Sequence, residues 1–297
     1  MLQATSLQRQ GNRISTIKHK VVKLVRRFRA MPARAGNLPV SWHIGRPNFG
    51  DDLNPLFWST LTERPVRLAT RRSKRTRPHA LGIGSILETA TEHSIVFGSG
   101  FLCADSGESV CAGRVLAIRG QLTADRLTMA PEYLGDPAVV VDLVFPQQRQ
   151  VEHQVEHQVG LIPHFSQKEK FQDLATSGAY LIDPAWPPSR VLEAICRCER
   201  VFSQSLHGLI IADAFGVPNG WVAPSDSMKG GDFKFRDYYT TTDRGKIAIP
   251  LARLSDAITA KSVDVFVSRY RFEKQSYMAA IRKAAADHFP KNCDALT

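Results

Sequence analysis

A histidine stands at the junction of a strand and a helix in the stretch RVFSQSLHGLIIADAFGVP, residues 200–218. Val201 and Phe202 begin the stretch as a buried strand, and an apolar helix follows His207. Open α/β sheets bind ligands at the carboxyl ends of their strands, and the first turn of a helix attracts anions. An imidazole there can give or take a proton near neutral pH. The stretch therefore predicts an anion site served by His207.

Three further residues able to carry a proton or a positive charge follow other strand-like runs. His164 comes after Leu-Ile-Pro, and Lys234 and Arg236 alternate with aromatic residues in DFKFRDYY, after another apolar run. A single histidine is more often a hydrogen-bonded core residue, but two histidines at strand ends favour a functional site. We therefore expect His164, Lys234 and Arg236 to face the same cleft as His207.

Two carboxylates and an arginine in the first half of the chain complete the set. In GRPNFGDDLN, residues 45–54, Asp51 and Asp52 stand beside a helix start. Carboxylates there can accept sugar hydroxyls or serve as a base, and they can equally cap the helix. Arg119 follows a strand run and could clamp a phosphate or carboxylate. The alternative for Arg119 is an ion pair with Asp142 or another acid.

Strand and helix signals alternate around these residues in the first half. A strand is expected at residues 40–45 and a helix at 54–63, with Asn54 as its cap and Pro55 at its first position. Continuous apolar runs between helical stretches are typical of parallel strands, which are buried on both faces. Further apolar runs occupy residues 66–70, 80–87, 94–100, 114–120 and 138–145.

The second half repeats this alternation and closes with a long helix near residues 267–288. A helix is expected at 191–198, and strands at 160–165, 178–184, 201–202 and 220–224. The pattern predicts an α/β fold of two Rossmann-like domains that face a cleft, the GT-B-like layout. The expected parts are a basic amphipathic arm (1–39), a first domain (40–146), a linker (147–158), a second domain (159–250) and C-terminal helices (251–297).

The expected linker contains the unit Val-Glu-His-Gln twice, beginning at residues 151 and 155. His153 and His157 would bind a metal if this segment were helical, but a local duplication in a tolerant loop is the simpler reading. The five cysteines are an odd number without metal-type spacing. We read them as reduced, which suits a cytoplasmic protein.

The net charge of +11 is concentrated in the arm, where residues 1–39 carry nine Lys or Arg and no acid. Apolar residues share one helical face there, which indicates either a helix on an anionic membrane surface or a solvated arm. No nucleic-acid motif accompanies the charge. No apolar run approaches the ~20 residues of a membrane span, so we expect a cytoplasmic protein whose arm reaches the inner face of the membrane. The basic run 71–77 reads as a solvated loop, with contact to an acceptor or lipid phosphate as the alternative.

Six short motifs follow one another between residues 40 and 243. They are G-x-x-N-x-G-D-D-L-N, I-R-G-x-L-T, G-D-P-A, I-P-H, S-x-S-L-H-G-L-I-x-A-D-A and F-K-F-R-D-Y-Y. In this order they resemble the polysaccharide pyruvyltransferase family, and most closely its xanthan-type and succinoglycan-type ketal pyruvyltransferases. Related members often carry Arg where Ser205 stands here, so the donor's cation must come from another residue.

The resemblance implies an enzyme that transfers the pyruvyl group of phosphoenolpyruvate to two hydroxyls of a sugar, leaving a cyclic ketal and phosphate. It implies no metal and no cofactor, and its acceptor is a sugar or a lipid-linked oligosaccharide bound to the first domain. We assign catalysis to His207 as the acid and to Asp51, and acceptor binding to Asn48 and Asp52. Donor binding is assigned to Arg119, His164, Ser205, Gly208, Lys234 and Arg236.

The state of His207 depends on its neighbours. A helix N-terminus lowers the pKa of the imidazole, and a bound dianionic donor raises it, so we expect the protonated form once the donor is bound. Two other functions remain open. One is a GT-B glycosyltransferase that uses a nucleotide sugar, and the other is a non-catalytic peripheral component of polysaccharide assembly.

Overall fold

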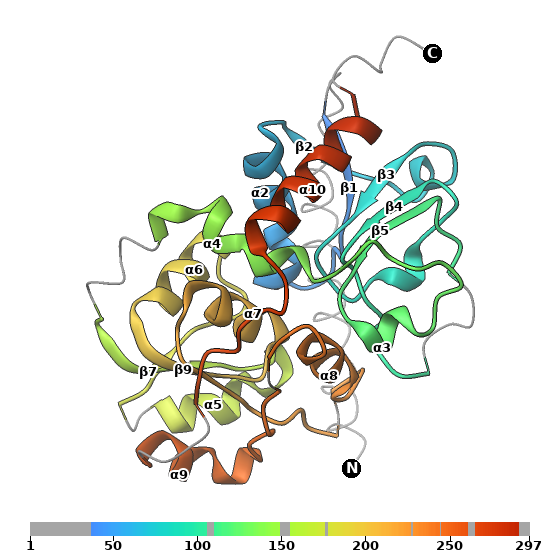
Figure 1. Cartoon of the computed structure of the whole chain (residues 1–297). Coiled ribbons are helices and arrows are strands. Elements are labelled where there is room, and N and C mark those ends of the chain that lie inside the picture. The colour runs from blue at the N-terminus through green and yellow to red at the C-terminus, as the bar shows by residue number, and fades with distance from the viewer. Residues whose placement is uncertain are drawn as a thin grey trace, which may run out of the picture.

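The computed structural model describes residues 37–105, 110–148, 155–175, 178–226, 228–243, 245–260 and 265–290. Two parallel β-sheets, each flanked by helices, form the fold (Figure 1). The six-stranded sheet has the order β2-β1-β3-β4-β5-β6, and the four-stranded sheet has the order β10-β9-β7-β8. The prediction of an α/β fold with parallel strands in both halves is confirmed.

Short strands make up both sheets. The first sheet contains β1 (Leu38–Ser41), β2 (Val66–Leu68), β3 (His79–Leu81), β4 (Ser94–Phe97), β5 (Arg114–Ile118) and β6 (Tyr133–Leu134). The second sheet contains β7 (His157–Ile162), β8 (Tyr180–Leu181), β9 (Cys198–Ser203) and β10 (Asn219–Trp221). Every pairing within the two sheets is parallel.

Helices connect these strands and cover the sheets. They are α2 (Phe49–Thr62), α3 (Gln121–Ala124), α4 (Val141–Val144), α5 (Lys168–Ala175), α6 (Pro188–Cys196), α7 (Leu206–Phe215), α8 (Phe233–Tyr239), α9 (Leu254–Thr259) and α10 (Lys274–His288). Short 3₁₀ turns are η1 (Ser73–Arg75), η2 (Leu87–Thr89), η3 (Pro137–Val140), η5 (Phe165–Gln167) and η6 (Leu251–Arg253). No helix in these described stretches is long and apolar enough to cross a bilayer.

Helix α2 begins five residues earlier than expected. Its N-cap is Asn48, whose side chain accepts a hydrogen bond from the Gly50 amide at 3.3 Å. Pro55 lies inside the helix and leaves the Asp51 carbonyl without its usual i+4 donor, and Asn54 Nδ2 donates to that carbonyl instead at 3.1 Å. Asn54 also pairs with both backbone polar groups of Ile83. The prediction of Asn54 as the cap was wrong because its amide serves as a buried connector.

The apolar run at residues 138–145 is helical. It forms η3 and α4, in which Ala138, Val139, Val140 and Val141 are all fully buried. Burial on all sides produces the same continuous apolar signal in a short helix as in a central strand. This run packs against α7 and so joins the two halves.

The two C-terminal helices pack in different places. Helix α9 contributes Leu254, Ala257 and Ile258 to a core cluster of the second half. Helix α10 returns to the first half, where it lies beside α2 (Figure 1) and Tyr277 Oη donates to the Gly135 carbonyl at 2.7 Å. The expected domain limits remain a prediction.

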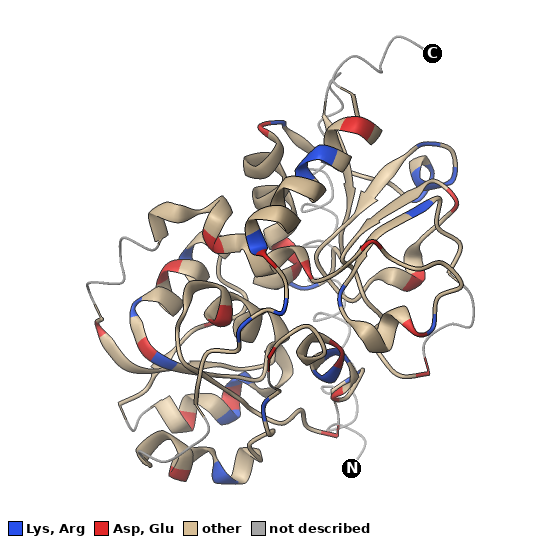
Figure 2. Cartoon of the chain, in the orientation of Figure 1, with Lys and Arg blue, Asp and Glu red and all other residues tan. Residues whose placement is uncertain are grey.

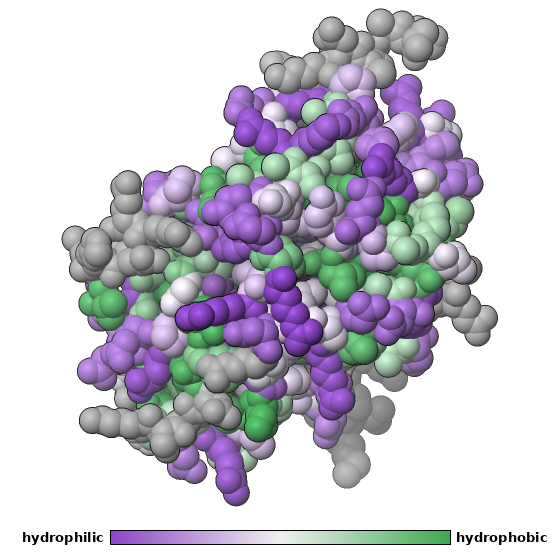
Figure 3. All heavy atoms as spheres, viewed as in Figure 1, coloured by the Kyte–Doolittle hydropathy of each residue, from purple (hydrophilic) through white to green (hydrophobic). Residues whose placement is uncertain are grey.

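One hydrophobic core runs through both halves. A single cluster of buried residues includes Leu38 and Phe57 of the first half and Val191 and Ile210 of the second. The face in Figure 3 is mostly hydrophilic, with hydrophobic residues in small patches between. The amphipathic arm lies outside the described residues except for 37–39, so its membrane role also remains a prediction.

The expected linker is described only in part. Residues 149–154, which include His153, lie outside the described residues, and His157 is the first residue of β7. The His157 ring stacks on Tyr180 with 3.8 Å between centroids. Cys103, Cys111, Cys196 and Cys198 are free thiols, as expected.

Candidate active site

The topology of each sheet marks one edge where loops diverge. In the first sheet β1 is followed by β2 on one side and by β3 on the other, so the switch lies between β1 and β3. In the second sheet the switch lies between β7 and β9 for the same reason. Such points open a crevice at the carboxyl ends of the strands.

His207 lies where these two switch points meet. It follows β9 in the first turn of α7, and its ring packs directly over Gly50, which follows β1. A Cβ atom built on Gly50 would come within 2.1 Å of His207 Nδ1. Only glycine leaves room for the imidazole at this position.

A buried carboxylate faces the other ring nitrogen. Asp136 Oδ2 lies 3.8 Å from His207 Nε2, and neither atom has a hydrogen-bond partner among the described residues. Asp136 Oδ1 accepts from the Ala138 amide at 2.9 Å and is thereby fixed. His207 is 9% exposed and Asp136 0%. Two unsatisfied buried polar groups that face each other form an unusual pair in a folded protein.

Burial dominates the ionisation of both groups. The pKa of His207 is lowered to about 3, first by desolvation and then by the positive charges of Lys234 and Arg119. Desolvation raises the pKa of Asp136 to about 7, against the Ala138 hydrogen bond and the charge of Arg119. The expected lowering of the pKa of His207 is therefore present, but burial is its main cause. Without a bound anion the imidazole is neutral at pH 7.

Lys234 is the cation that these groups share. Its charge lowers the pKa of both His207 and His164, so its ammonium lies near both histidines. Its own pKa is lowered to about 8 by burial and by Arg119, while Asp51 opposes the shift. His164 Nδ1 lies 2.8 Å from Ser166 Oγ. The structure thus brings His164, His207, Lys234 and Asp51 together.

The acidic residues of the first half hold the start of α2. Asn48 Nδ2 donates to Asp51 Oδ2 at 2.9 Å, and Asp52 Oδ2 accepts from the Asn48 amide at 3.2 Å. A Cβ atom on Gly84, which follows β3, would lie 3.3 Å from Asp51 Oδ1. Asp51 therefore holds the side chain of the N-cap Asn48 and also lies beside Gly84, at the switch point of the first sheet.

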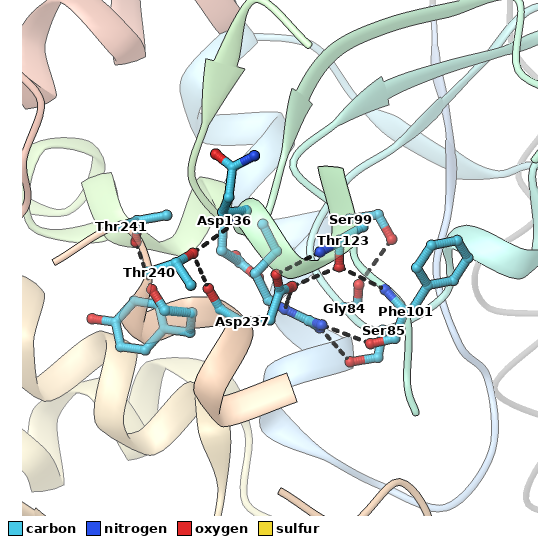
Figure 4. A network of polar contacts seen from close by, with 12 residues as sticks. Gly84, Ser85, Ser99, Phe101, Thr123, Asp136, Asp237, Thr240 and Thr241 are labelled. Atoms are coloured by element: carbon cyan, nitrogen blue, oxygen red, sulfur yellow. Dashed lines mark hydrogen bonds and ion pairs between the residues drawn. The ribbon is translucent and has the colours of Figure 1, made fainter. Parts of the chain in front are cut away.

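Arg119 is enclosed by the protein. Its side chain is 0% exposed; Nε donates to Asp237 Oδ2 at 2.9 Å, Nη1 to Ser85 Oγ at 2.7 Å and Nη2 to the Phe101 carbonyl at 2.6 Å. Figure 4 shows Ser85, Phe101, Thr123 and Asp237 gathered in this network. Of the two roles expected for Arg119, the ion pair with an acid is the one observed, and the acid is Asp237.

Asp142, the other acid considered for Arg119, pairs with Lys274 instead. Asp237 is a residue that the sequence reading did not single out. Besides Arg119, it accepts from the Thr123 amide at 2.8 Å and from Thr123 Oγ1 at 2.6 Å. The bonds to Thr123 join α8 to α3, and the bond to Arg119 joins α8 to the end of β5.

Arg236 points away from Lys234 and from the His207 cluster. Both lie on helix α8, where residues two apart point about 200° away from each other. Arg236 pairs with Asp232 at 2.7 Å and lines a separate cavity of about 800 Å³ beside Trp221 and Tyr239. The expectation that Arg236 faces the His207 cluster was wrong because FKFRDYY is helical.

Ser205 and Gly208 frame the start of α7. Ser205 is the N-cap residue, but its side chain makes no capping hydrogen bond, so that the first amides of α7 lack this partner. Gly208 packs inward: a Cβ atom there would lie 2.4 Å from Ser203 Oγ. Its role in the structure is close packing of α7 on β9.

Three residues in or near the cluster were not predicted from the sequence. Asp136 lies in the G-D-P-A motif and Gly50 in G-D-D-L-N, but nothing in their local pattern shows that they meet His207. Asp237 lies between aromatic residues. A glycine before two acids and an acid before Pro137 are ordinary turn and cap signals, so only the tertiary contact reveals their role.

Part of the chain matches a known protein family. The family model "Polysaccharide pyruvyl transferase" matches residues 116–226, which contain Arg119, Asp136, His164 and His207. This segment of the chain is similar to the polysaccharide pyruvyl transferase domain. The expected resemblance is confirmed on this segment.

Two similar proteins match more of the chain than residues 116–226. The succinoglycan biosynthesis protein ExoV of Rhizobium meliloti (strain 1021) is 33% identical over 217 residues, 68% of this chain, and the chain spans 64% of that protein. An uncharacterized protein of Acanthamoeba polyphaga mimivirus is 26% identical over 67% of this chain and 72% of its own length. A crystal structure of an uncharacterized Klebsiella pneumoniae protein covers 69% of this chain and 87% of its own, with 11% identity and a TM-score of 0.39.

Proposed function

We propose that this protein transfers the pyruvyl group of phosphoenolpyruvate to two hydroxyls of a sugar in an exopolysaccharide repeat unit. The products are a cyclic pyruvate ketal and phosphate. The observation that carries the proposal is His207, a buried histidine at the first turn of α7, where the switch points of both sheets meet beside Lys234. The family match and the likeness to ExoV support the reaction class.

The donor site is built from Lys234 and the start of α7. Phosphoenolpyruvate carries a phosphate and a carboxylate, and a helix N-terminus with free amides favours such anions. Lys234 supplies the full positive charge that Ser205 does not. Arg119, whose guanidinium is used by Asp237, Ser85 and Phe101, acts on the donor only through its charge and by holding α8.

His207 supplies the proton. The bound anion raises the pKa of the imidazole, which then protonates the methylene carbon of phosphoenolpyruvate and leaves an oxocarbenium-like centre at the adjacent carbon. A sugar hydroxyl adds to that centre and loses its proton. The carbon–oxygen bond to phosphate then breaks, and a second hydroxyl closes the ketal. Of the two hydroxyl protons, one restores the imidazolium and the other leaves with phosphate.

Asp51 is the base for the sugar hydroxyl. Its charge partly offsets the lowering of the pKa of Lys234. Asp51 also lies beside Gly84, at the switch point of the first sheet. Asn48 and Asp52, on the same turn of α2, are placed to hold the acceptor next to it. His164, near Lys234, is placed to contact the donor.

Asp136 positions His207 for this chemistry. Its Oδ2 atom faces Nε2 at 3.8 Å, and a carboxylate there stabilises the imidazolium that exists once the donor is bound. The Nδ1 side of the ring lies against Gly50, which belongs to the first half.

The choice of donor tests the proposal. Thermal shifts of the full chain are measured with phosphoenolpyruvate and with a panel of nucleotide sugars, together with phosphate release from phosphoenolpyruvate in the presence of an oligosaccharide acceptor. We expect stabilisation by phosphoenolpyruvate and acceptor-dependent phosphate release. Stabilisation by a nucleotide sugar alone, without phosphate release, would establish the glycosyltransferase alternative instead.

A further inference from the structure

A basic pocket lies at the carboxyl ends of β1 and β2, apart from the His207 cluster. Its volume is about 590 Å³. The ionisable and aromatic side chains that line it are Trp42, His43, Arg71, Lys74, Arg75 and Glu88. The carboxyl ends of parallel strands are where open α/β sheets bind ligands.

The cations of the basic pocket have no acidic partner in the described part of the chain. Arg71, Lys74 and Arg75 form no ion pair there, and three cations against the single carboxylate of Glu88 leave an excess of two positive charges. Lys74 is half-buried, and desolvation lowers its pKa. A partly desolvated ammonium without a carboxylate is costly unless a ligand anion accompanies it. The excess charge matches a phosphate group better than a single carboxylate.

The basic segment has a defined conformation. Thr70 Oγ1 accepts from the Ser73 amide at 3.2 Å, and the Thr91 hydroxyl donates to the Lys74 carbonyl at 2.7 Å. Thr91 itself lines the basic pocket. Figure 2 shows the Lys and Arg residues of this stretch on the connection into β3. Most residues of the run 71–77 are exposed, as expected for a solvated loop, and the two threonines fix the path of this loop.

Two loops join the basic pocket to the His207 cluster. The loop after β1 lines the pocket at residues 42–44, and the first turn of α2, which follows this loop, packs Gly50 on His207. Eight residues, 43–50, span at most about 29 Å of extended chain. The segment after β3 begins with Gly84 beside Asp51 and lines the pocket at residues 88–91. The pocket and the cluster are therefore connected through the same two segments of the first half.

We propose that the basic pocket binds a phosphate group of the sugar acceptor, a monoester or a diphosphate, and so directs the sugar toward His207. The inference rests on the proposed function for the identity of the acceptor. The charge and place of the pocket support phosphate binding independently. Free phosphate shares this chemistry, so the experiment must separate the two sources.

Charge-neutral variants test the pocket directly. The triple variant Arg71→Gln/Lys74→Gln/Arg75→Gln removes the lining cations, and Arg72→Gln/Arg77→Gln changes two exposed arginines of the same run that do not line the pocket. Titration calorimetry with inorganic pyrophosphate should show affinity at least ~10-fold weaker in the triple variant and little changed in the control. Circular dichroism confirms that both variants fold. Equal affinity in the triple variant and the unmodified protein would overturn the proposal.

Kinetics with two acceptors distinguish binding of the acceptor's phosphate from binding of free phosphate. The triple variant should raise the KM of a glycosyl diphosphate by ~10-fold or more, with the KM of the same unphosphorylated sugar and kcat unchanged. Relief of product inhibition by phosphate without a KM change would assign the pocket to free phosphate and overturn the acceptor proposal. If phosphoenolpyruvate is not turned over with either acceptor, the proposed function fails, and the pyrophosphate titration still decides whether the pocket binds phosphate.

Discussion

The proposed proton transfer depends first on the pair formed by His207 and Asp136. Each is buried, and each has an oxygen or nitrogen that makes no hydrogen bond to the part of the chain that the structure describes; these two atoms lie 3.8 Å apart. Burial moves their pKa values in opposite directions, to about 3 for His207 and about 7 for Asp136. The resting pair is therefore close to neutral, and an anionic ligand favours the imidazolium.

Asp136→Asn tests this ionisation through stability. The pKa of Asp136 is raised in the folded state, so between about pH 4 and 7 the folded protein keeps a proton that the unfolded chain has released. The stability that this proton contributes is present at low pH and is lost as pH rises through about 7. Asn is neutral throughout, so the variant should gain stability relative to the unmodified protein from pH 5 to pH 8. Urea unfolding at both pH values measures this; a stability difference that does not change with pH would contradict the raised pKa.

Among the secondary-structure elements, the contact between α2 and α7 shapes the candidate site. The N-cap Asn48 starts α2 early enough to place Gly50 in its first turn, and Gly50 is the position against which the His207 ring packs. Neither helix alone forms the site. The contact between their N-terminal turns fixes the imidazole.

Gly50→Ala should disturb this contact more than folding. The new methyl would lie 2.1 Å from His207 Nδ1, so the ring must move out of place. We expect kcat to fall by ~10-fold or more, since a displaced proton donor loses much of its contribution. Gly245→Ala is the matched control because the nearest atom to its methyl is 3.5 Å away. Similar kcat values for both variants would show that the ring position does not matter.

Local pattern identified most elements but not their contacts. The strands at β1, β4, β7 and β9 follow from apolar runs bounded by Gly and polar residues. Residues 138–145 were expected as a strand and are helical instead, because full burial hides the period that separates helix from strand. His164 and His207 do follow strands, as expected from the sequence, while their roles stay predictions. The Asp136 and Gly50 contacts could not be found, because they join segments distant in sequence.

At the scale of the whole molecule, the Arg119–Asp237 pair joins the halves. Arg119 follows β5 of the first sheet, Asp237 belongs to α8 after β10, and both side chains are 0% exposed. Asp237 also binds Thr123. This joint holds α8, and therefore Lys234, against the first half.

Arg119→Met should lower stability by about 3–5 kcal/mol, because it leaves the Asp237 carboxylate buried without its counter-ion. Arg114→Met is the control, since Arg114 pairs with Glu132 at the surface, where ion pairs contribute little. Chemical unfolding of both variants measures the difference. Equal, small losses would show that the buried pair does not hold the halves together.

The central claim is that His207 delivers a proton to phosphoenolpyruvate. The most direct measurement is the rate of phosphate release from phosphoenolpyruvate, at saturating acceptor, for His207→Gln beside His164→Gln. Glutamine keeps hydrogen bonding but cannot deliver a proton. We expect His207→Gln to lose ~10²- to 10⁴-fold in kcat with a smaller change in donor KM, and His164→Gln mainly to raise donor KM. Near-normal turnover in His207→Gln, with the large loss in His164→Gln, would contradict the account.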